Sequence, residues 1–142
     1  MLLVRILVTL VLGSGLLVAA PAAAWDADYG RVWRGDGVLE PGCHLYRFRY
    51  RVRPGNDDWV AEFFLRGPGG EGLGTVAKDS DIHRKRGKGK YEVCHQSTRP
   101  GRFTIRGKLS IHGPDDHNPL TPPQGPTVKW VKPAKFRLSA PR

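Results

Sequence analysis

The feature that most constrains the fold of this chain is a strict two-residue alternation between Cys43 and Arg53. In the segment CHLYRFRYRVR, aromatic and β-branched side chains alternate with arginines. Alternation of this kind is typical of a β-strand with one face on a hydrophobic core and the other in water. We therefore expect a half-buried strand, with His44, Tyr46, Phe48, Tyr50 and Val52 on the inner face and Arg47, Arg49, Arg51 and Arg53 on the outer face.

Other short segments carry the same signal, separated by Gly- and Pro-rich turns. Segments 59–66, 91–95, 102–112 and 128–138 are predicted strands, with a short strand in 73–82 and a weak edge strand around Val32, Val38 and Leu39. In segment 59–66, the expected inner face carries Trp59, Ala61, Phe63 and Leu65. Strand 59–66 should form an antiparallel hairpin with 43–53, and Pro133 should mark a bulge or break. Six to eight short strands without a helical segment predict an all-β antiparallel β-sandwich.

Two cysteines, Cys43 and Cys94, are the only ones in the chain, and they are separated by 51 positions. Two cysteines in an exported protein normally form a disulfide, so we expect one Cys43–Cys94 bond. A loop of that length predicts a stabilisation of roughly 4 kcal/mol. The alternative is two reduced thiols.

Export is predicted by the N-terminus. Residues 1–18 are almost wholly apolar with one early charge, Arg5, and Ala22–Ala24 supply the small residues of a cleavage site. The pattern indicates a secretory signal peptide over 1–24, which leaves a single secreted β-sandwich domain over 25–142. The alternative is an uncleaved membrane anchor. We expect the mature protein to be extracellular.

Positive charge is concentrated in one region of a chain whose formal net charge is +10. Residues 84–108 carry nine Lys and Arg and one acid, a net of +8, whereas residues 25–83 carry eight Lys and Arg and ten acids, a net of −2. The segment His83–Lys90, HRKRGKGK, predicts a solvated basic loop. A second loop, with five prolines, is expected over 113–127. Regional charge favours an anionic partner.

A cysteine opening one strand, Trp59 sixteen residues later, and the segment Gly89–Cys94 together resemble the frame of immunoglobulin-like domains over Cys43 to about Ile111. The resemblance implies an immunoglobulin-like sandwich. The chain departs from it at Glu92, where that family has tyrosine; Tyr91 stands one position earlier. Both cysteines also fall on the outer faces of their strands, so either bulges shift the register or the bond lies at the edge of the sandwich. The chain is also similar to small exported proteins of unknown function from GC-rich bacteria, which implies export and no activity.

Catalytic and metal-binding motifs are missing from the sequence. His44 and His95 each follow a cysteine and could approach one another, but zinc requires three or four ligands and we can name two. Asp115–Asn118 lacks the spacing and glycine of a calcium loop. No serine stands in a G-x-S-x-G motif, and the paired aspartates lie in single turns rather than across a cleft. We therefore predict no enzymatic activity, no metal and no cofactor.

The basic surface is the remaining candidate site. We predict that it binds an anionic polymer of the cell envelope or matrix, such as an anionic polysaccharide. We expect no specific nucleic-acid recognition, because exposed aromatic side chains interleaved with the cations are absent. The predicted residues are Arg84, Lys85, Arg86, Lys88, Lys90, Arg47, Arg49 and Arg51. The alternative function is a structural or protein-interaction accessory domain, whose charge only maintains solubility.

Overall fold

The computed structural model describes residues 24–113 and 125–142. The predicted signal peptide and most of the predicted 113–127 loop lie outside these residues. The described part is all-β, as predicted, apart from two short 3-10 helices, Ala27–Tyr29 (η1) and His95–Ser97 (η2). The strands are β1 Gly30–Trp33, β2 Gly37–Val38, β3 Cys43–Val52, β4 Trp59–Arg66, β5 Gly72–Asp79, β6 Arg86–Cys94, β7 Gly101–Ile111 and β8 Thr127–Ser139. In this part of the chain, no helix is long enough to cross a membrane.

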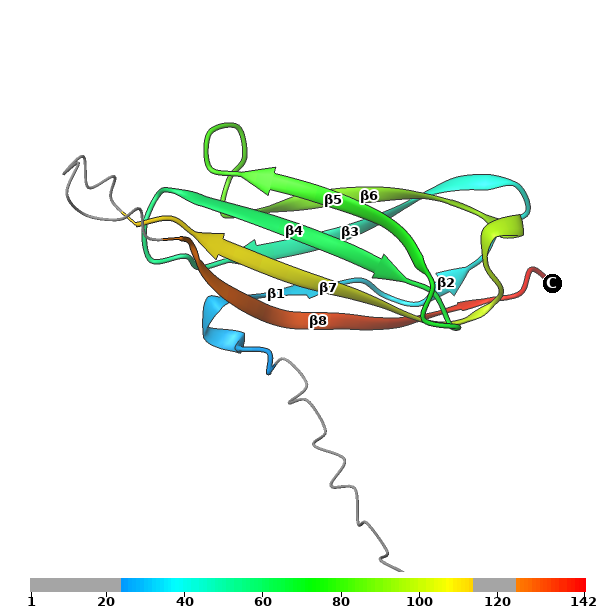
Figure 1. Cartoon of the computed structure of the whole chain (residues 1–142). Helices are drawn as coiled ribbons and strands as arrows, with labels where there is room; N and C mark the ends of the chain where they lie inside the picture. Colours follow the sequence, from blue (N-terminus) through cyan, green and yellow to red (C-terminus); the bar gives the residue numbers. More distant parts are fainter. Residues whose placement is uncertain (1–23, 114–124) are drawn as a thin grey trace, which may run out of the picture.

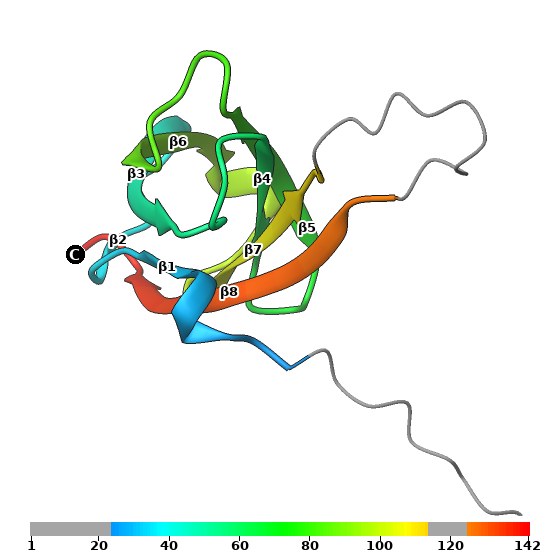
Figure 2. The same cartoon turned by 90° about the vertical axis from the view of Figure 1, so that its left-hand side faces the viewer.

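Hydrogen bonding joins the strands into one rolled sheet rather than two clearly separate ones. The order along the sheet is β5-β4-β7-β8-β1-β3-β6, and β2 pairs with β8. Viewed end-on, the strands form a nearly closed, barrel-like ring around the core (Figure 2). The pairs β1–β8 and β2–β8 are parallel and the other pairs are antiparallel, so the expectation of a purely antiparallel sheet is corrected.

The expected hairpin between the first two strong strands is wrong. Strand β3 pairs with β1 and β6, and β4 pairs with β5 and β7, although a short turn joins β3 to β4 (Figure 1). The two strands instead face each other across the core, where the ring of Phe63 lies 5.3 Å from that of Phe48 and 5.1 Å from that of Tyr50. Aromatic rings from the two strands thus meet inside the core, which pairing of the strands along their edges would not allow.

The core confirms the predicted inner faces of the strong strands. Trp59, Ala61, Phe63 and Leu65 of β4 are all buried, and β3 buries Tyr46, Phe48, Tyr50 and Val52. His44 is the exception, because β3 is exposed at its first three residues. The core therefore begins at the third position after Cys43.

The weak edge strand predicted around Val32, Val38 and Leu39 is corrected in its first part, which is an inner strand, whereas its second part pairs with β8 alone. It divides into β1 and β2, and β1 lies between β8 and β3. Gly30 permits this close pairing: its φ is +134°, and a side chain there would overlap the carbonyl oxygen of Arg51 on β3. Pro133 lies in a bulge, as predicted, because Ile105 pairs with Ala134 while Gly107 pairs with Val131.

The disulfide Cys43–Cys94 is formed, with a Cα–Cα distance of 3.9 Å. Its two cysteines lie directly opposite each other on the neighbouring strands β3 and β6. Nine consecutive residue pairs join these strands without a register shift, so no bulge moves the cysteines to the inner face. The bond therefore ties adjacent strands on the outside, whereas in immunoglobulin domains the corresponding bond crosses between sheets.

Candidate functional site

Strand β6 begins with an alternation of cations and glycines. In Arg86–Lys90 (RGKGK), the cations are exposed, Gly87 is half-buried and Gly89 is buried. A Cβ atom at Gly89 would lie 2.2 Å from Cζ of Phe48, so glycine leaves the space that this ring occupies. The prediction of a basic loop over His83–Lys90 is therefore corrected for 86–90. Glycine next to lysine suggested a solvated loop, but these glycines accommodate aromatic rings from β3.

Strands β3 and β6 together place six cations in opposed pairs, which we call the cation ladder. Arg47 lies opposite Lys90, Arg49 opposite Lys88, and Arg51 opposite Arg86. All six are exposed. Directly opposed like charges destabilise a sheet, so the ladder lowers the stability of the unliganded fold.

Two neighbouring strands extend one row of the ladder. Arg31 of β1 lies opposite Arg51, and Lys132 of β8 lies opposite Arg31. With Arg86, four cations thus follow one another across four adjacent strands. Because neighbouring strands are about 4.8 Å apart, this row concentrates positive charge over a short distance.

Carboxylates do not pair with these cations in the described part of the chain. The three ion pairs there are Lys108–Glu62, Lys85–Asp57 and His83–Asp79. The exposed Glu92 lies opposite Leu45, one row beyond the ladder. The charge of the ladder and its extension is therefore available to an anion from outside.

A groove of about 810 Å³ runs over the same surface. It is lined by Arg31, Arg51, Arg86 and Lys132, by Arg49 and Lys88 of the next row, and by Trp33, Arg53 and Asp28. A second hollow of about 480 Å³ shares Trp33, Arg49 and Lys88 with the groove and adds Arg47 and Asp36. We call the ladder with Arg31, Trp33 and Lys132 the basic face.

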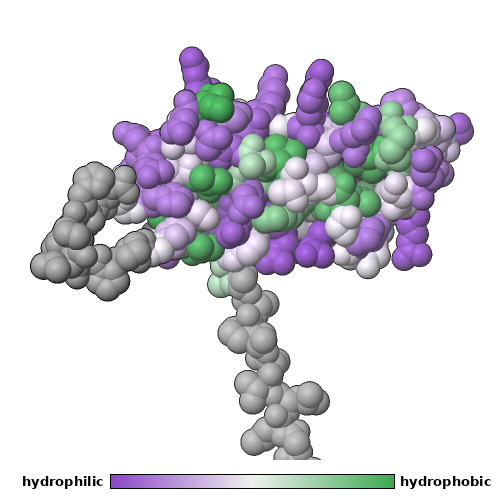
Figure 3. Space-filling view, turned by 45° about the horizontal axis from the view of Figure 1, so that its top comes forward, coloured by the Kyte–Doolittle hydropathy of each residue, from purple (hydrophilic) through white to green (hydrophobic). Residues whose placement is uncertain are grey.

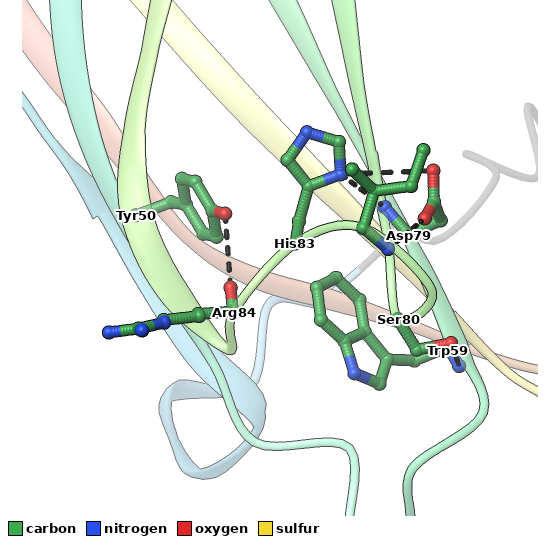
Figure 4. Close-up of polar contacts among 7 residues, drawn as sticks. Tyr50, Trp59, Asp79, Ser80, His83 and Arg84 are labelled. Atoms are coloured by element: carbon green, nitrogen blue, oxygen red, sulfur yellow. Dashed lines mark hydrogen bonds and ion pairs between the residues drawn. The ribbon is translucent and has the colours of Figure 1, made fainter.

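Arg84 and Lys85, two further predicted binding residues, lie in the turn before β6. The Lys85 ammonium donates a hydrogen bond of 2.8 Å to Asp57 and thereby holds the pKa of that carboxyl below its usual value. The carbonyl of Arg84 accepts a hydrogen bond of 3.0 Å from the Tyr50 hydroxyl (Figure 4). The structure thus brings six of the eight predicted residues together on the ladder and places the other two in the adjoining turn.

The same turn gathers a serine, a histidine and an aspartate. His83 Nδ1 lies 3.8 Å from a carboxylate oxygen of Asp79. Ser80 Oγ accepts a hydrogen bond of 3.3 Å from the Trp59 amide, and Figure 4 shows Ser80 beside Trp59, away from the His83 ring. A nucleophilic triad requires the serine to contact the histidine, so this cluster stabilises the turn and offers no triad geometry.

The histidines next to the disulfide occupy exposed positions. His44 Nε2 lies 2.7 Å from the carbonyl oxygen of Pro41, and the His95 amide donates to the carbonyl of Gly42. Within residues 24–113 and 125–142, no group of three His, Cys, Asp or Glu side chains is placed to hold a metal ion. Asp115–Asn118, considered above for calcium, lies outside the described residues.

Sequence reasoning missed three members of the basic face: Arg31, Trp33 and Lys132. Arg31 and Trp33 alternate with the buried Val32, but four residues are too few for a clear strand signal. Their pairing with Arg51 and Arg49 depends on the tertiary fold. The expectation that no aromatic side chain stands among the surface cations is therefore corrected, because the guanidinium of Arg31 lies 4.8 Å from the ring centroid of Trp33.

Comparison with protein-family models, with curated proteins and with solved structures found no match to this chain. Function is therefore inferred from the geometry of the basic face alone.

Proposed function

We propose that this protein is a secreted, non-enzymatic binding module whose basic face binds an anionic polymer of the cell envelope or matrix. The observation that carries the proposal is the cation ladder with its four-strand row, where cation lies opposite cation and the described residues supply no paired carboxylate. Three rows of opposed cations and a connected groove offer several anion positions at once, which suits a polymer better than a single small anion.

The energetics support the same conclusion. Each opposed pair of like charges costs about 0.2–1 kcal/mol in a sheet, and a bound anionic group between the two cations removes that cost. A polymer that neutralises several cations also releases its condensed counterions, so its binding weakens steeply with salt. The face should therefore bind its ligand tightly at low ionic strength and release it at high ionic strength.

Secretion and the resemblance to immunoglobulin-like domains are parts of this proposal. The disulfide is consistent with an extracellular location. A signal peptide over 1–24 and a mature domain over 25–142 would deliver the protein there. We also retain the immunoglobulin-like sandwich as a hypothesis, supported by the spacing of Cys43, Trp59 and Cys94; the parallel pairs and the adjacent-strand disulfide depart from that pattern.

A matched pair of triple variants tests the proposal on a dextran sulfate column eluted with sodium chloride. The first variant, Arg49→Ser, Arg51→Ser and Lys88→Ser, removes three charges from the basic face. The control, Arg99→Ser, Arg102→Ser and Arg137→Ser, removes three exposed charges from outside it. We expect the first variant to elute at much lower salt than the wild type and the control to elute close to it. Equal shifts in both variants would show that only net charge matters.

A second candidate function, a protein-interaction accessory domain without a polyanion ligand, is favoured by a different surface. The outer face of β4, β7 and β8 carries Val128, which is 45% exposed, and the half-buried rings of Phe64 and Trp130, 6.3 Å apart. Apolar contacts resist salt, so this function predicts retention on cell envelopes at high ionic strength and loss of that retention in Trp130→Ser.

A further inference from the structure

We infer that Trp33 recognises a sugar ring in the ligand of the basic face, so that the anionic polymer is an acidic polysaccharide. This inference rests on the proposed function and specifies its ligand class. It draws on a feature that charge attraction alone does not require, namely an indole among the cations of the groove.

The position of Trp33 is the first part of the argument. It lies on the outer side of β1, directly opposite Arg49, and is only partly buried. Trp33 lines the 810 Å³ groove, the adjoining 480 Å³ hollow and a third hollow of about 220 Å³ beside Lys132. The indole therefore stands between three hollows, where a polymer that follows the surface has to pass it.

The surroundings of Trp33 are the second part. The guanidinium of Arg31 lies 4.8 Å from the centroid of its ring, and a cation in that position is attracted to the indole. Arg49 and Lys88 line the same two hollows as Trp33. A ring packed on the indole can thus place an attached carboxylate or sulfate against these cations. Binding sites of this kind combine an apolar surface with a few positioned polar groups.

A sugar fits this arrangement better than a nucleobase. Surfaces that bind single-stranded nucleic acid present successive aromatic side chains, one for each stacked base. In the described part of the groove, Trp33 is the one aromatic side chain on the outside, because Tyr50, which also lines it, is 2% exposed and belongs to the core. Trp25 lines a separate hollow with Trp130. One aromatic contact flanked by cations suits one acidic sugar ring.

The surface over β5 and β6 is largely hydrophilic. Seen from that side, hydrophilic residues cover much of the molecule and hydrophobic ones are scattered among them (Figure 3).

The test compares three polyanions that differ in what carries the charge. Dextran sulfate has sugar rings, inorganic polyphosphate has no rings, and oligo(dT) has nucleobases. Dissociation constants are measured for the wild type, Trp33→Ala, Trp33→Phe and the control Trp130→Ala, at one salt concentration and with probes matched for charge. We expect Trp33→Ala to weaken binding of dextran sulfate by about five-fold, the size of one aromatic contact, and to leave polyphosphate binding unchanged. Trp33→Phe should restore part of the loss, and Trp130→Ala should bind like the wild type.

Several outcomes would overturn the inference. Equal losses for dextran sulfate and polyphosphate in Trp33→Ala would assign the residue a structural role, and no loss for either would remove it from the site. Oligo(dT) binding more tightly than dextran sulfate, with the larger loss in Trp33→Ala, would identify a nucleobase site. If the wild type binds polyphosphate but shows no preference for dextran sulfate, the proposed function stands and the sugar inference fails. If it binds none of the three probes, the proposed function itself fails.

Discussion

Two outer faces of the same sheet carry cations in opposite settings. On β4, β7 and β8, Lys108 Nζ lies 2.9 Å from a carboxylate oxygen of Glu62, and the guanidinium of Arg106 lies 4.4 Å from the ring centroid of Trp130. On β3 and β6, arginines and lysines lie opposite other arginines and lysines. The first face thus pairs Lys108 with a carboxylate and packs Arg106 on an indole, although Arg102 and Arg137 lie opposite each other there. The second face leaves all six cations of the ladder to solvent or a ligand.

The difference teaches that charge count alone does not identify a binding surface. Both faces present basic side chains at alternate positions of long antiparallel strands, and both show the same alternation of basic and apolar residues in the sequence. What distinguishes them is the residue on the neighbouring strand: Glu62 stands opposite Lys108, and Lys88 stands opposite Arg49. The pairing partner, set by the fold, decides which cations are neutralised.

The strands that carry the cation ladder, whose opposed cations repel each other, are also joined by a covalent bond. The disulfide Cys43–Cys94 joins β3 and β6 in the same register as the ladder, two rows beyond the Arg47–Lys90 pair. It holds together the two strands whose outer side chains repel each other. On the other face, the ion pair Glu62–Lys108 joins the neighbouring strands β4 and β7 instead.

The largest expected effect comes from removing the disulfide. The double variant Cys43→Ser, Cys94→Ser should lose roughly 4 kcal/mol of unfolding free energy, because the closed loop spans 51 positions. Urea unfolding of oxidised wild type and variant measures the difference. A loss below about 1 kcal/mol would contradict the view that this bond stabilises the repulsive face.

The next effect concerns the space under the ladder. Gly89→Ala should cost about 1–3 kcal/mol, because the new methyl group would overlap the Phe48 ring, which is packed 5.0 Å from the ring of Tyr91. Gly72→Ala in β5 is the matched control, since a Cβ there meets nothing within 4 Å. Chemical denaturation of both variants gives the comparison. Equal costs would show that strand propensity rather than packing determines the effect.

Reversing one charge on each face should give effects of opposite sign. Arg49→Glu places a carboxylate opposite Lys88 and should stabilise the fold by about 0.2–1 kcal/mol, whereas Glu62→Lys opposes Lys108 and should destabilise it by a similar amount. Unfolding at low ionic strength measures both. The same sign for the two variants would remove the distinction between the faces.

Salt should reveal the repulsion in the unmodified protein. Raising ionic strength from about 0.01 M to 0.15 M shortens the Debye length from about 30 Å to 8 Å and screens the exposed ladder. The melting temperature of the wild type should therefore rise, and that of Arg49→Glu should rise less. Calorimetry with chloride as the anion provides the measurement. An equal rise in the two proteins would place the repulsion elsewhere on the surface.

The smallest expected effect is at the Lys85–Asp57 pair, which lies outside the ladder. The pKa of Asp57 is lowered by Lys85, so the pair stabilises the fold above the unfolded carboxyl pKa, and this contribution is lost as the pH falls through the folded value. Because the Asp57 side chain is fully exposed, Lys85→Met should change the melting temperature little at neutral pH. Near about pH 2 the difference from the wild type should vanish. A large loss at neutral pH would give Lys85 a structural role.

Much of the strand content followed from side-chain alternation. The inner faces of β3 and β4 could be predicted because Tyr46–Val52 and Trp59–Leu65 place every second side chain in the core. Strand β6 could be predicted only from Tyr91 onward, because Gly87 and Gly89 carry no apolar side chain to mark the inner face. Only the β3 half of the ladder could therefore be predicted as a strand face, formed by Arg47, Arg49 and Arg51. The β6 half, with Arg86, Lys88 and Lys90, resembled a loop.

By itself, the sequence determined that this chain forms strands and which side of the strong ones meets water, because the two-residue period is a local property of an extended backbone. It also supplied two cysteines able to bond. Only the tertiary structure decided that Cys43 lies beside Cys94, that Arg49 lies between Lys88 and Trp33, and that β3 and β4 oppose each other across the core. Such neighbours depend on how aromatic side chains far apart in the chain fill one interior, which local periodicity does not record.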